Sequence, residues 1–238
     1  MRLHVKELSA GRLELRGEAF HYLARVLRVR REDRVVLFDG AGREADATVD
    51  SVGEEALVLT AGELRAAAAG GVPLTLLIAL LKGEKMDLVV QKATELGVSR
   101  LVPLASAHAV VRLGDDRRDS RRGRWQKIAS EAARQSGRAD VPEIAEILPP
   151  EAAFAAAPPH ALRLIFDERD APPLRQVLAD ARPVEVVAAV GPEGGFAPAE
   201  VDAARAAGFL PAGLGPRVLR AETAAIASLA MLRFALDR

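Results

Sequence analysis

The sequence contains 238 residues with 33 basic and 33 acidic side chains, so its formal net charge is zero. Half of the residues are hydrophobic and 28% are charged, which excludes a disordered chain. Cysteine is absent, which excludes disulfides and thiolate metal sites and favours a reducing compartment. The apolar runs fall short of the roughly 20 residues of a membrane span, and residues 1–10 lack the apolar region of a signal peptide. We therefore expect a cytoplasmic protein with no membrane partner.

The first 65 residues are rich in predicted strands. Apolar alternation between turn residues predicts strands at 34–40, 41–52 and 55–64. A helix is expected over 18–27, where apolar residues recur at helical spacing. Short, closely spaced strands are typical of a small β-barrel.

The stretch 65–73 (RAAAAGGVP) interrupts this pattern with small residues and a proline, so we expect two domains, 1–69 and 73–238. In the second, apolar strands alternate with amphipathic helices, which indicates an α/β fold with a mostly parallel sheet covered on both faces. The expected order is a strand at 74–81, a helix at 83–97 ending at Gly97, a strand at 98–105, a basic helix at 121–137, further segments at 143–148, 162–168, 174–180, 184–190 and 198–208, and a terminal helix at 222–236.

A glycine-rich turn at 191–196 (GPEGGF) follows an apolar strand, where open parallel sheets bind ligands. It matches neither common phosphate-binding loop, because Pro192 removes a backbone donor and Glu193 would repel a phosphate. Gly194 and Gly195 permit positive φ and a close approach of the backbone. The turn therefore suits a cation or a hydrogen-bond donor, or is a plain tight turn with a solvated acid.

A second turn runs into the last helix at 214–225 (LGPRVLRAETAA) and carries Arg217, Arg220 and Glu222. Two such turns at the ends of neighbouring elements, holding both signs of charge, could enclose a zwitterionic ligand. S-adenosyl-L-methionine fits this description because it has a sulfonium, an ammonium and a carboxylate but no phosphate. Free amino acids fit the charges as well.

Basic residues gather in two clusters. Residues 100–138 contain ten Lys or Arg against four Asp or Glu, and a second basic run covers 24–34. Two clusters in a neutral chain favour a surface that contacts phosphates, although a solvated helix face explains either alone. Arg25 and Arg28, spaced i and i+3 on the expected helix, are candidates for such contacts.

The pair of turns, 191–196 and 214–224, resembles the SPOUT methyltransferases of the RsmE type, which are 16S ribosomal RNA uridine-N3 methyltransferases. The similarity extends through 82–98 (KGEKMDLVVQKATELGV), 124–142 (RWQKIASEAARQSGRADVP) and 21–30 (HYLARVLRVR), so it covers nearly the whole chain in order.

The resemblance implies a C-terminal SPOUT α/β domain with a deep trefoil knot, preceded by a small PUA-like β-barrel that binds RNA. The knot loops, at 165–168, 191–196 and 214–224, would bind S-adenosyl-L-methionine. The protein would be a homodimer through the knotted domain. Its product would be N3-methyluridine in the decoding region of 16S rRNA, within the small ribosomal subunit.

The resemblance also implies site residues. Arg220 would stabilise the uracil anion or hold a phosphate, while Glu193 or Glu222 would accept the N3 proton or anchor the donor, unless Arg220 and Glu222 form a structural pair. The candidate donor-binding residues are Phe166, Gly191, Glu193, Gly194, Gly195, Phe196, Leu214, Gly215, Val218, Leu219, Thr223 and Ala224. The candidate RNA contacts are Arg2, His21, Arg25, Arg28, Arg112, Arg121, Arg122 and Arg124. The four histidines lack ligand spacing, so no metal site is expected.

Two positions depart from the family pattern. His108 stands near an expected Arg-Ser pair, so an RNA contact there has changed or moved to Arg112. Ala197 replaces a small hydroxyl residue and removes an N-cap worth about 1 kcal/mol. Three other functions remain open: methylation of tRNA or large-subunit rRNA, a non-catalytic ribosome-assembly factor, and an amino-acid- or nucleotide-binding domain.

Overall fold

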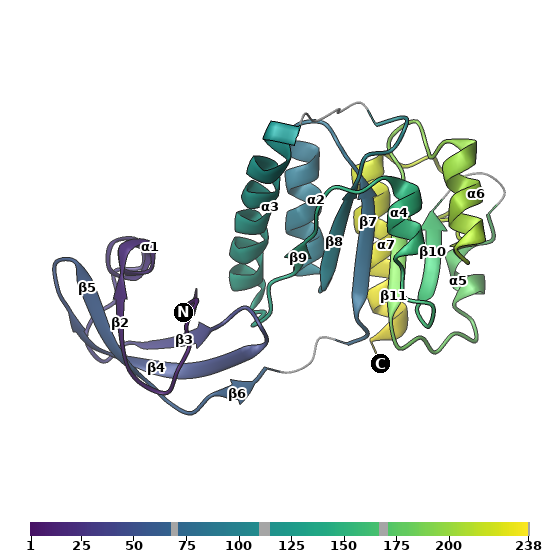
Figure 1. Ribbon diagram of the computed structural model, residues 1–238. Coiled ribbons are helices and arrows are strands. Elements are labelled where there is room, and N and C mark those ends of the chain that lie inside the picture. Colours follow the sequence, from purple (N-terminus) through teal and green to yellow (C-terminus); the bar gives the residue numbers. More distant parts are fainter. Residues whose placement is uncertain (68–70, 110–114, 167–170, 238) are drawn as a thin grey trace. The chain divides into compact units, whose positions relative to one another are not determined.

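A computed structural model describes residues 1–67, 71–109, 115–166 and 171–237, without the side chains of 115–117. The chain divides into two compact units (Figure 1). The first unit contains residues 1–69 and 130–141, and the second contains 70–129 and 142–238. None of the helices within the described ranges has the length and apolar character needed to cross a membrane.

The first unit is built on a six-stranded sheet with the order β1-β3-β4-β5-β2, to which β6 adds by pairing with β4. Only the β1–β3 pair is parallel among these strands of the described chain. The bounds are β1 Arg2–His4, β2 Gly11–Arg16, β3 Arg34–Phe38, β4 Arg43–Val52, β5 Ala56–Ala61 and β6 Arg65–Ala66. The three predicted strands are therefore confirmed as β3, β4 and β5, whereas β1, β2 and β6 were not predicted.

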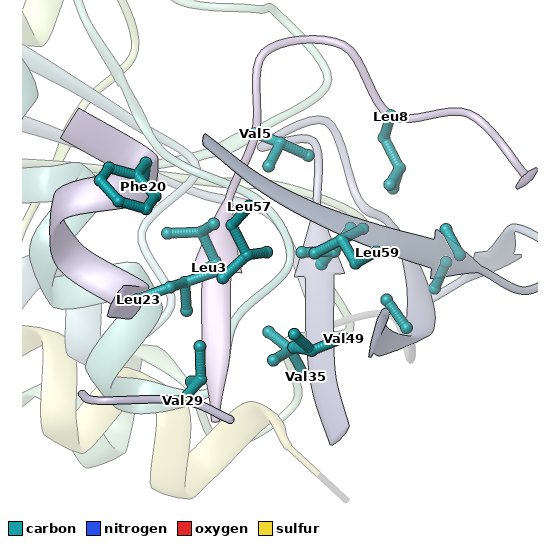
Figure 2. Packing of buried hydrophobic residues seen from close by; sticks show 14 residues of the cluster. Leu3, Val5, Leu8, Phe20, Leu23, Val29, Val35, Val49, Leu57 and Leu59 are labelled. Atoms are coloured by element: carbon teal, nitrogen blue, oxygen red, sulfur yellow. The ribbon is translucent and has the colours of Figure 1, made fainter. Parts of the chain in front are cut away.

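The core of the first unit lies between this sheet and a short helical segment (Figure 2). That segment consists of α1 (Gly17–Phe20) and a π-helix, η1 (His21–Val26). Buried residues alternate with exposed ones along β4 and β5, so one face of the sheet supplies Val49, Leu57 and Leu59 to the core.

Residues 130–141 belong to the first unit through several specific contacts. The Arg134 guanidinium lies 4.1 Å from the centre of the Tyr22 ring, a cation–π distance. The Gly42 amide donates to the Ala139 carbonyl at 3.1 Å, and the Val141 amide donates to the carbonyl of Gly40 at 2.9 Å. The last turns of the basic helix thus complete the fold that the N-terminal residues begin.

The second unit contains a six-stranded sheet with the order β12-β10-β11-β7-β8-β9, in which every pair is parallel. Strand β11 is buried at all five positions, as expected for a strand covered on both faces. The predicted parallel sheet is therefore confirmed. Its strands are β7 Leu74–Ala79, β8 Arg100–Leu104, β9 Glu143–Ile144, β10 Leu162–Phe166, β11 Val186–Val190 and β12 Leu210–Pro211.

Helices cover both faces of this sheet. On one face, α4 and α6 pack over Leu77, Val102 and Val187. Residues that alternate with these point to the opposite face, where α7 contacts β11 and α2. The helices are α2 Glu84–Glu95, α3 Asp115–Ser136, α4 Pro150–Ala155, α5 Leu174–Val177, α6 Pro198–Ala206 and α7 Ala221–Leu236.

The strand order determines where the functional turns meet. Strand β10 pairs with β11 on one side and with β12 on the other, although both follow it in the chain. All three strands are parallel, so their carboxyl ends lie at the same edge of the sheet. The segments that follow β10, β11 and β12 therefore come together at that edge, as ligand binding in an open α/β sheet requires.

Candidate active site

A pocket of about 270 Å³ is enclosed by the ends of β10 and β11, the segments that follow β11 and β12, and the first turn of α7. Nine predicted donor-binding residues line it: Phe166, Gly191, Glu193, Gly194, Gly195, Leu214, Gly215, Leu219 and Ala224. Seven lining residues were not predicted as donor contacts: Ala171, Val190, Pro192, Ala212, Gly213, Arg217 and Ala221. Six of these lie within or beside the two predicted turns, whereas Ala171 carries no signal in the sequence.

Three predicted donor contacts do not line the pocket. Phe196 is 2% exposed and packs edge-on against Phe154, so it supports the turn from behind. Val218 is 81% exposed, and Thr223 is exposed on the first turn of α7. The remaining part of knot loop 165–168, namely residues 167 and 168, lies outside the described residues.

The turn after β11 needs its glycines for two different reasons. A Cβ on Gly191 would lie 3.1 Å from both the amide nitrogen and a ring carbon of Phe196, so a side chain there would press on the buried ring. Gly195 has φ +71°, a conformation that glycine adopts at little cost. Its amide donates to the carbonyl of Pro192 at 2.9 Å and closes the turn.

The buried carboxylate of Glu200 anchors this turn to the loop after β8. Ala197 provides no side-chain cap for α6, as the sequence predicts. Its backbone amide instead donates to Glu200 Oε2 at 2.8 Å. The same carboxylate accepts hydrogen bonds from the Ser106 hydroxyl at 2.9 Å and from the Ala107 amide at 2.8 Å. Glu200 therefore accepts a hydrogen bond from an amide at the start of its own helix, and it also holds the 105–109 loop beside the pocket.

His108, the departure from the family pattern, contacts the same turn. Its Nδ1 lies 3.2 Å from the carbonyl oxygen of Gly195, and its Cβ would be 3.4 Å from a Cβ placed on Gly194. The histidine thus packs on the outside of the pocket wall. Arg112, the alternative RNA contact, lies outside the described residues.

Lys85, which was not predicted as a site residue, joins the two acids of the site. Its Nζ lies 2.6 Å from Glu193 Oε1 and 3.4 Å from Glu222 Oε2. The hydrogen bond to Glu193 raises the pKa of Lys85, and the same bond lowers the pKa of Glu193. A carboxylate with a lowered pKa is a weak base, which disfavours Glu193 as the acceptor of the N3 proton. The sequence offered one signal for Lys85, its place in the stretch 82–98.

The candidate catalytic residues occupy different environments. Glu193 lines the pocket, whereas Glu222 does not; the Glu222 side chain is 12% exposed beside Lys85. Arg220 is exposed and precedes α7 at its N-cap position. Both partners of the expected Arg220–Glu222 pair are described, and no ion pair joins them in this part of the chain. Arg217, not Arg220, is the arginine that lines the pocket.

Both parts of the chain match known families. Residues 70–233 match an RNA methyltransferase domain, and residues 15–61 match the PUA domain of RNA methyltransferases. A ribosomal RNA small subunit methyltransferase E of Synechocystis is 34% identical over 98% of this chain and 76% of its own length. The chain belongs to the ribosomal RNA small subunit methyltransferase E family. This confirms the resemblance inferred from the two turns.

Solved structures of two relatives have the same fold. The ribosomal RNA small subunit methyltransferase E of Neisseria gonorrhoeae, bound to S-adenosyl methionine, is 31% identical, with a TM-score of 0.89 over 99% of this chain and 97% of that chain. A methyltransferase of Legionella pneumophila in complex with the cofactor SAM is also 31% identical, with a TM-score of 0.89 over 98% of this chain and 97% of that chain. The α/β methyltransferase fold with a PUA-like domain is therefore confirmed.

A methyltransferase of this family needs an RNA-binding surface, and the candidates in the first unit differ in exposure. Arg2 is partly buried and paired with Glu44 at 2.8 Å, so it stabilises the sheet. His21 and Arg25 are exposed on η1. Arg28 is exposed with φ +54°, beyond the end of the helical segment. The expectation that Arg25 and Arg28 share a helix face is therefore wrong, because the helical segment ends at Val26 and Arg28 has a non-helical backbone conformation.

The candidate RNA-contacting arginines on α3 are partly neutralised by acidic partners. Arg124 pairs with Asp87 of α2 at 2.5 Å, and Arg122 lies 3.4 Å from Glu146. Arg121 is only partly exposed. Since paired guanidiniums have less charge to offer a phosphate, this strip is a weaker RNA surface than its composition indicates.

Proposed function

We propose that this protein transfers a methyl group from S-adenosyl-L-methionine to N3 of a uridine in the decoding region of 16S rRNA. The observation that carries the proposal is the pocket between the two glycine-rich turns at the carboxyl edge of the sheet. The names of the curated relatives support small-subunit ribosomal RNA as the substrate, and the bound ligand of the Neisseria protein supports the donor.

The pocket suits this donor in shape and charge. Gly191, Gly194 and Gly195 bring backbone close to the pocket, and Leu214 and Leu219 supply apolar surface for an adenine. Glu193 and Arg217 offer one charge of each sign for a zwitterion. When bound, S-adenosyl-L-methionine supplies an already activated methyl group. The pocket residues then need to bind and orient their ligand and to exclude water.

We assign distinct roles to the charged residues. Of the two acids only Glu193 lines the pocket, and its lowered pKa keeps it ionised, so it anchors a donor cation. Arg220 is exposed beside the pocket and stabilises negative charge on the uracil oxygens. Orientation of reactants supplies roughly 7–11 kcal/mol, against about 3–5 kcal/mol for a positioned acid or base. Damage to the turns should therefore slow the reaction more than loss of either charge.

The division of labour follows the two family matches. Residues 1–69 bind RNA as a PUA-like barrel, and residues 73–238 bind the donor in a SPOUT domain with a trefoil knot, a division that the matched models support. The protein works in the cytoplasm on the small ribosomal subunit. It is a homodimer through the knotted domain, which two exposed apolar residues of α7 support: Met231, 45% exposed, and Phe234, 92% exposed.

Methyl transfer to defined acceptors tests the proposal. Labelled S-adenosyl-L-methionine would be incubated with the protein and unmodified small subunits, naked 16S RNA or bulk tRNA, and the nucleosides of each product would be identified. N3-methyluridine in the small subunits is the expected result. N3-methyluridine in tRNA alone would show that another RNA is the substrate. Bound donor without transfer to any acceptor would show a binding factor.

A further inference from the structure

Lys85 connects the two walls of the donor pocket. It lies in the first turn of α2, 108 residues before Glu193 and more distant still from Glu222. We propose that Lys85 is a positioning residue whose ammonium ties the 191–196 turn to the start of α7 and so holds the pocket in its binding geometry. This inference rests on the proposed function, because it assumes that the donor binds between these two walls.

The position of Lys85 in α2 runs against helix preference. The first turn of a helix carries partial positive charge, which favours acids such as Glu84 and Asp87 and disfavours a lysine. Lys85 nevertheless occupies this turn, where Glu193 and Glu222 supply the compensating charge. The placement is therefore explained by the two acids of the pocket walls and not by the stability of α2 alone.

The chemistry of the cluster shows what Lys85 prevents. Both carboxylates lie within 3.4 Å of one nitrogen, and together they carry one more charge than the lysine. Glu222 Oε2 is buried and has no hydrogen-bond partner in the described part of the chain, and Lys85 Nζ, 3.4 Å away, is the cation that faces it. Without the ammonium the two acids repel each other, and the turn and the helix start that carry them separate.

The same helix supplies a matched control. Lys92 also lies on α2, with Nζ 2.8 Å from Glu95 Oε2. The side chains of Lys85 and Lys92 are 35% and 38% exposed, so Lys85→Met and Lys92→Met each remove one lysine of similar exposure. Only Lys85→Met removes a contact to the pocket walls. Lys85→Arg keeps a cation and serves as the conservative variant.

Amide hydrogen exchange of the full-length, donor-free protein is the first test. Lys85→Met should speed exchange in 191–196 and 221–225 by about fivefold, the change expected for ion pairs of this exposure, while Lys92→Met should leave both segments unchanged. Glu222→Gln should speed exchange at 221–225 only, and adding Lys85→Met to it should give no further change there. Equal exchange in Lys85→Met and wild type, or equal effects of Lys85→Met and Lys92→Met, would overturn the proposal.

Donor affinity is the second test. Calorimetry with S-adenosyl-L-methionine should give a Kd about fivefold higher in Lys85→Met, and Lys85→Arg should restore it to within about twofold. In turnover, the KM for the donor should rise more than kcat falls, since a positioning residue acts on binding. An unchanged Kd in Lys85→Met would overturn the positioning role. If the wild type binds no donor, the proposed function fails, and the exchange experiment alone then decides whether Lys85 ties the walls together.

Discussion

The two turns that enclose the pocket are built in opposite ways. The 191–196 turn is fixed from several sides, with Phe196 2% exposed beneath it and Lys85 and His108 bonded to it. The 214–220 segment is open, with Val218 81% exposed and Arg217 and Arg220 both exposed. One wall of the pocket is therefore preorganised by the core, and the other presents its side chains to solvent.

This difference separates two tasks of a methyltransferase. A donor of fixed shape is bound best by a wall that does not rearrange, because ordering a loop on binding costs affinity. A large RNA must reach the methyl group from outside, which requires accessible side chains. We infer that the fixed turn supplies preorganised contacts to the donor, while the open segment adds further donor contacts through Arg217 and meets the acceptor base through the exposed Arg220.

Truncation of the apolar residue in each turn should reveal the largest contrast. Phe196→Ala removes a buried ring and should lower the free energy of unfolding by about 3–5 kcal/mol. Val218→Ala changes an exposed side chain and should alter it by no more than about 0.5 kcal/mol. Urea denaturation of both variants measures the difference. Similar values for the two would contradict the contrast between a fixed and an open wall.

Two neighbouring glycines sharpen the description of the fixed wall. A Cβ on Gly191 would press on the Phe196 backbone at 3.1 Å, whereas one on Gly194 would meet only His108 at 3.4 Å, an ordinary contact. Gly191→Ala should therefore cost roughly 1–3 kcal/mol of donor binding or stability, and Gly194→Ala close to none. Calorimetry and thermal melting would show this. A Gly191→Ala protein with the wild-type Kd and Tm would mean that the turn is softer than its packing indicates.

The two arginines of the open segment should separate binding from turnover. Arg217 lines the pocket, so Arg217→Ala should raise the donor Kd about tenfold, the value of one charge-assisted hydrogen bond. Arg220→Ala should leave the donor Kd within about twofold and lower kcat. Binding and single-turnover measurements on both variants provide the test. An unchanged kcat in Arg220→Ala would remove its catalytic role.

The smallest effect should appear at acid pH. Because Lys85 lowers the folded-state pKa of Glu193, this acid contributes stability above the ordinary carboxyl value of 4.5, and the contribution disappears as the pH falls through the lower folded value. The side chain is 36% exposed, so Glu193→Gln should cost at most about 1 kcal/mol at pH 7. Unfolding free energies of wild type and variant should differ at pH 7 and converge as the pH falls below the folded-state pKa of Glu193. A difference that does not shrink as the pH is lowered would exclude the ion pair as its source.

Local patterns made much of this molecule predictable. Strands β3, β4 and β5 follow from alternation over a few residues, and the parallel sheet follows from continuous apolar runs. The two turns were found because proline restricts the backbone locally and glycine allows conformations that other residues rarely adopt. Most predicted pocket residues line the pocket because they belong to those turns.

The features that the sequence did not reveal depend on contacts between distant residues. Lys85 meets Glu193 only because α2 packs against α7 beside the turn after β11. The exclusion of Phe196 from the pocket follows from its packing on Phe154, which no spacing encodes. Arg28 does not lie on a helix as expected, because its backbone has a positive φ, a conformation that glycine adopts far more readily than arginine.

The membership of residues 130–141 in the first unit has a consequence for synthesis of the chain. Residues 1–69 leave the ribosome with their hydrophobic core present, but the Gly40 carbonyl and the Gly42 amide lack the partners supplied by Val141 and Ala139 until residue 141 has been added. At typical translation rates this delay lasts roughly 4–14 s. A nascent chain is thus held in a half-finished fold while the ribosome makes residues 70–141, and a fragment ending at residue 69 would remain in that state.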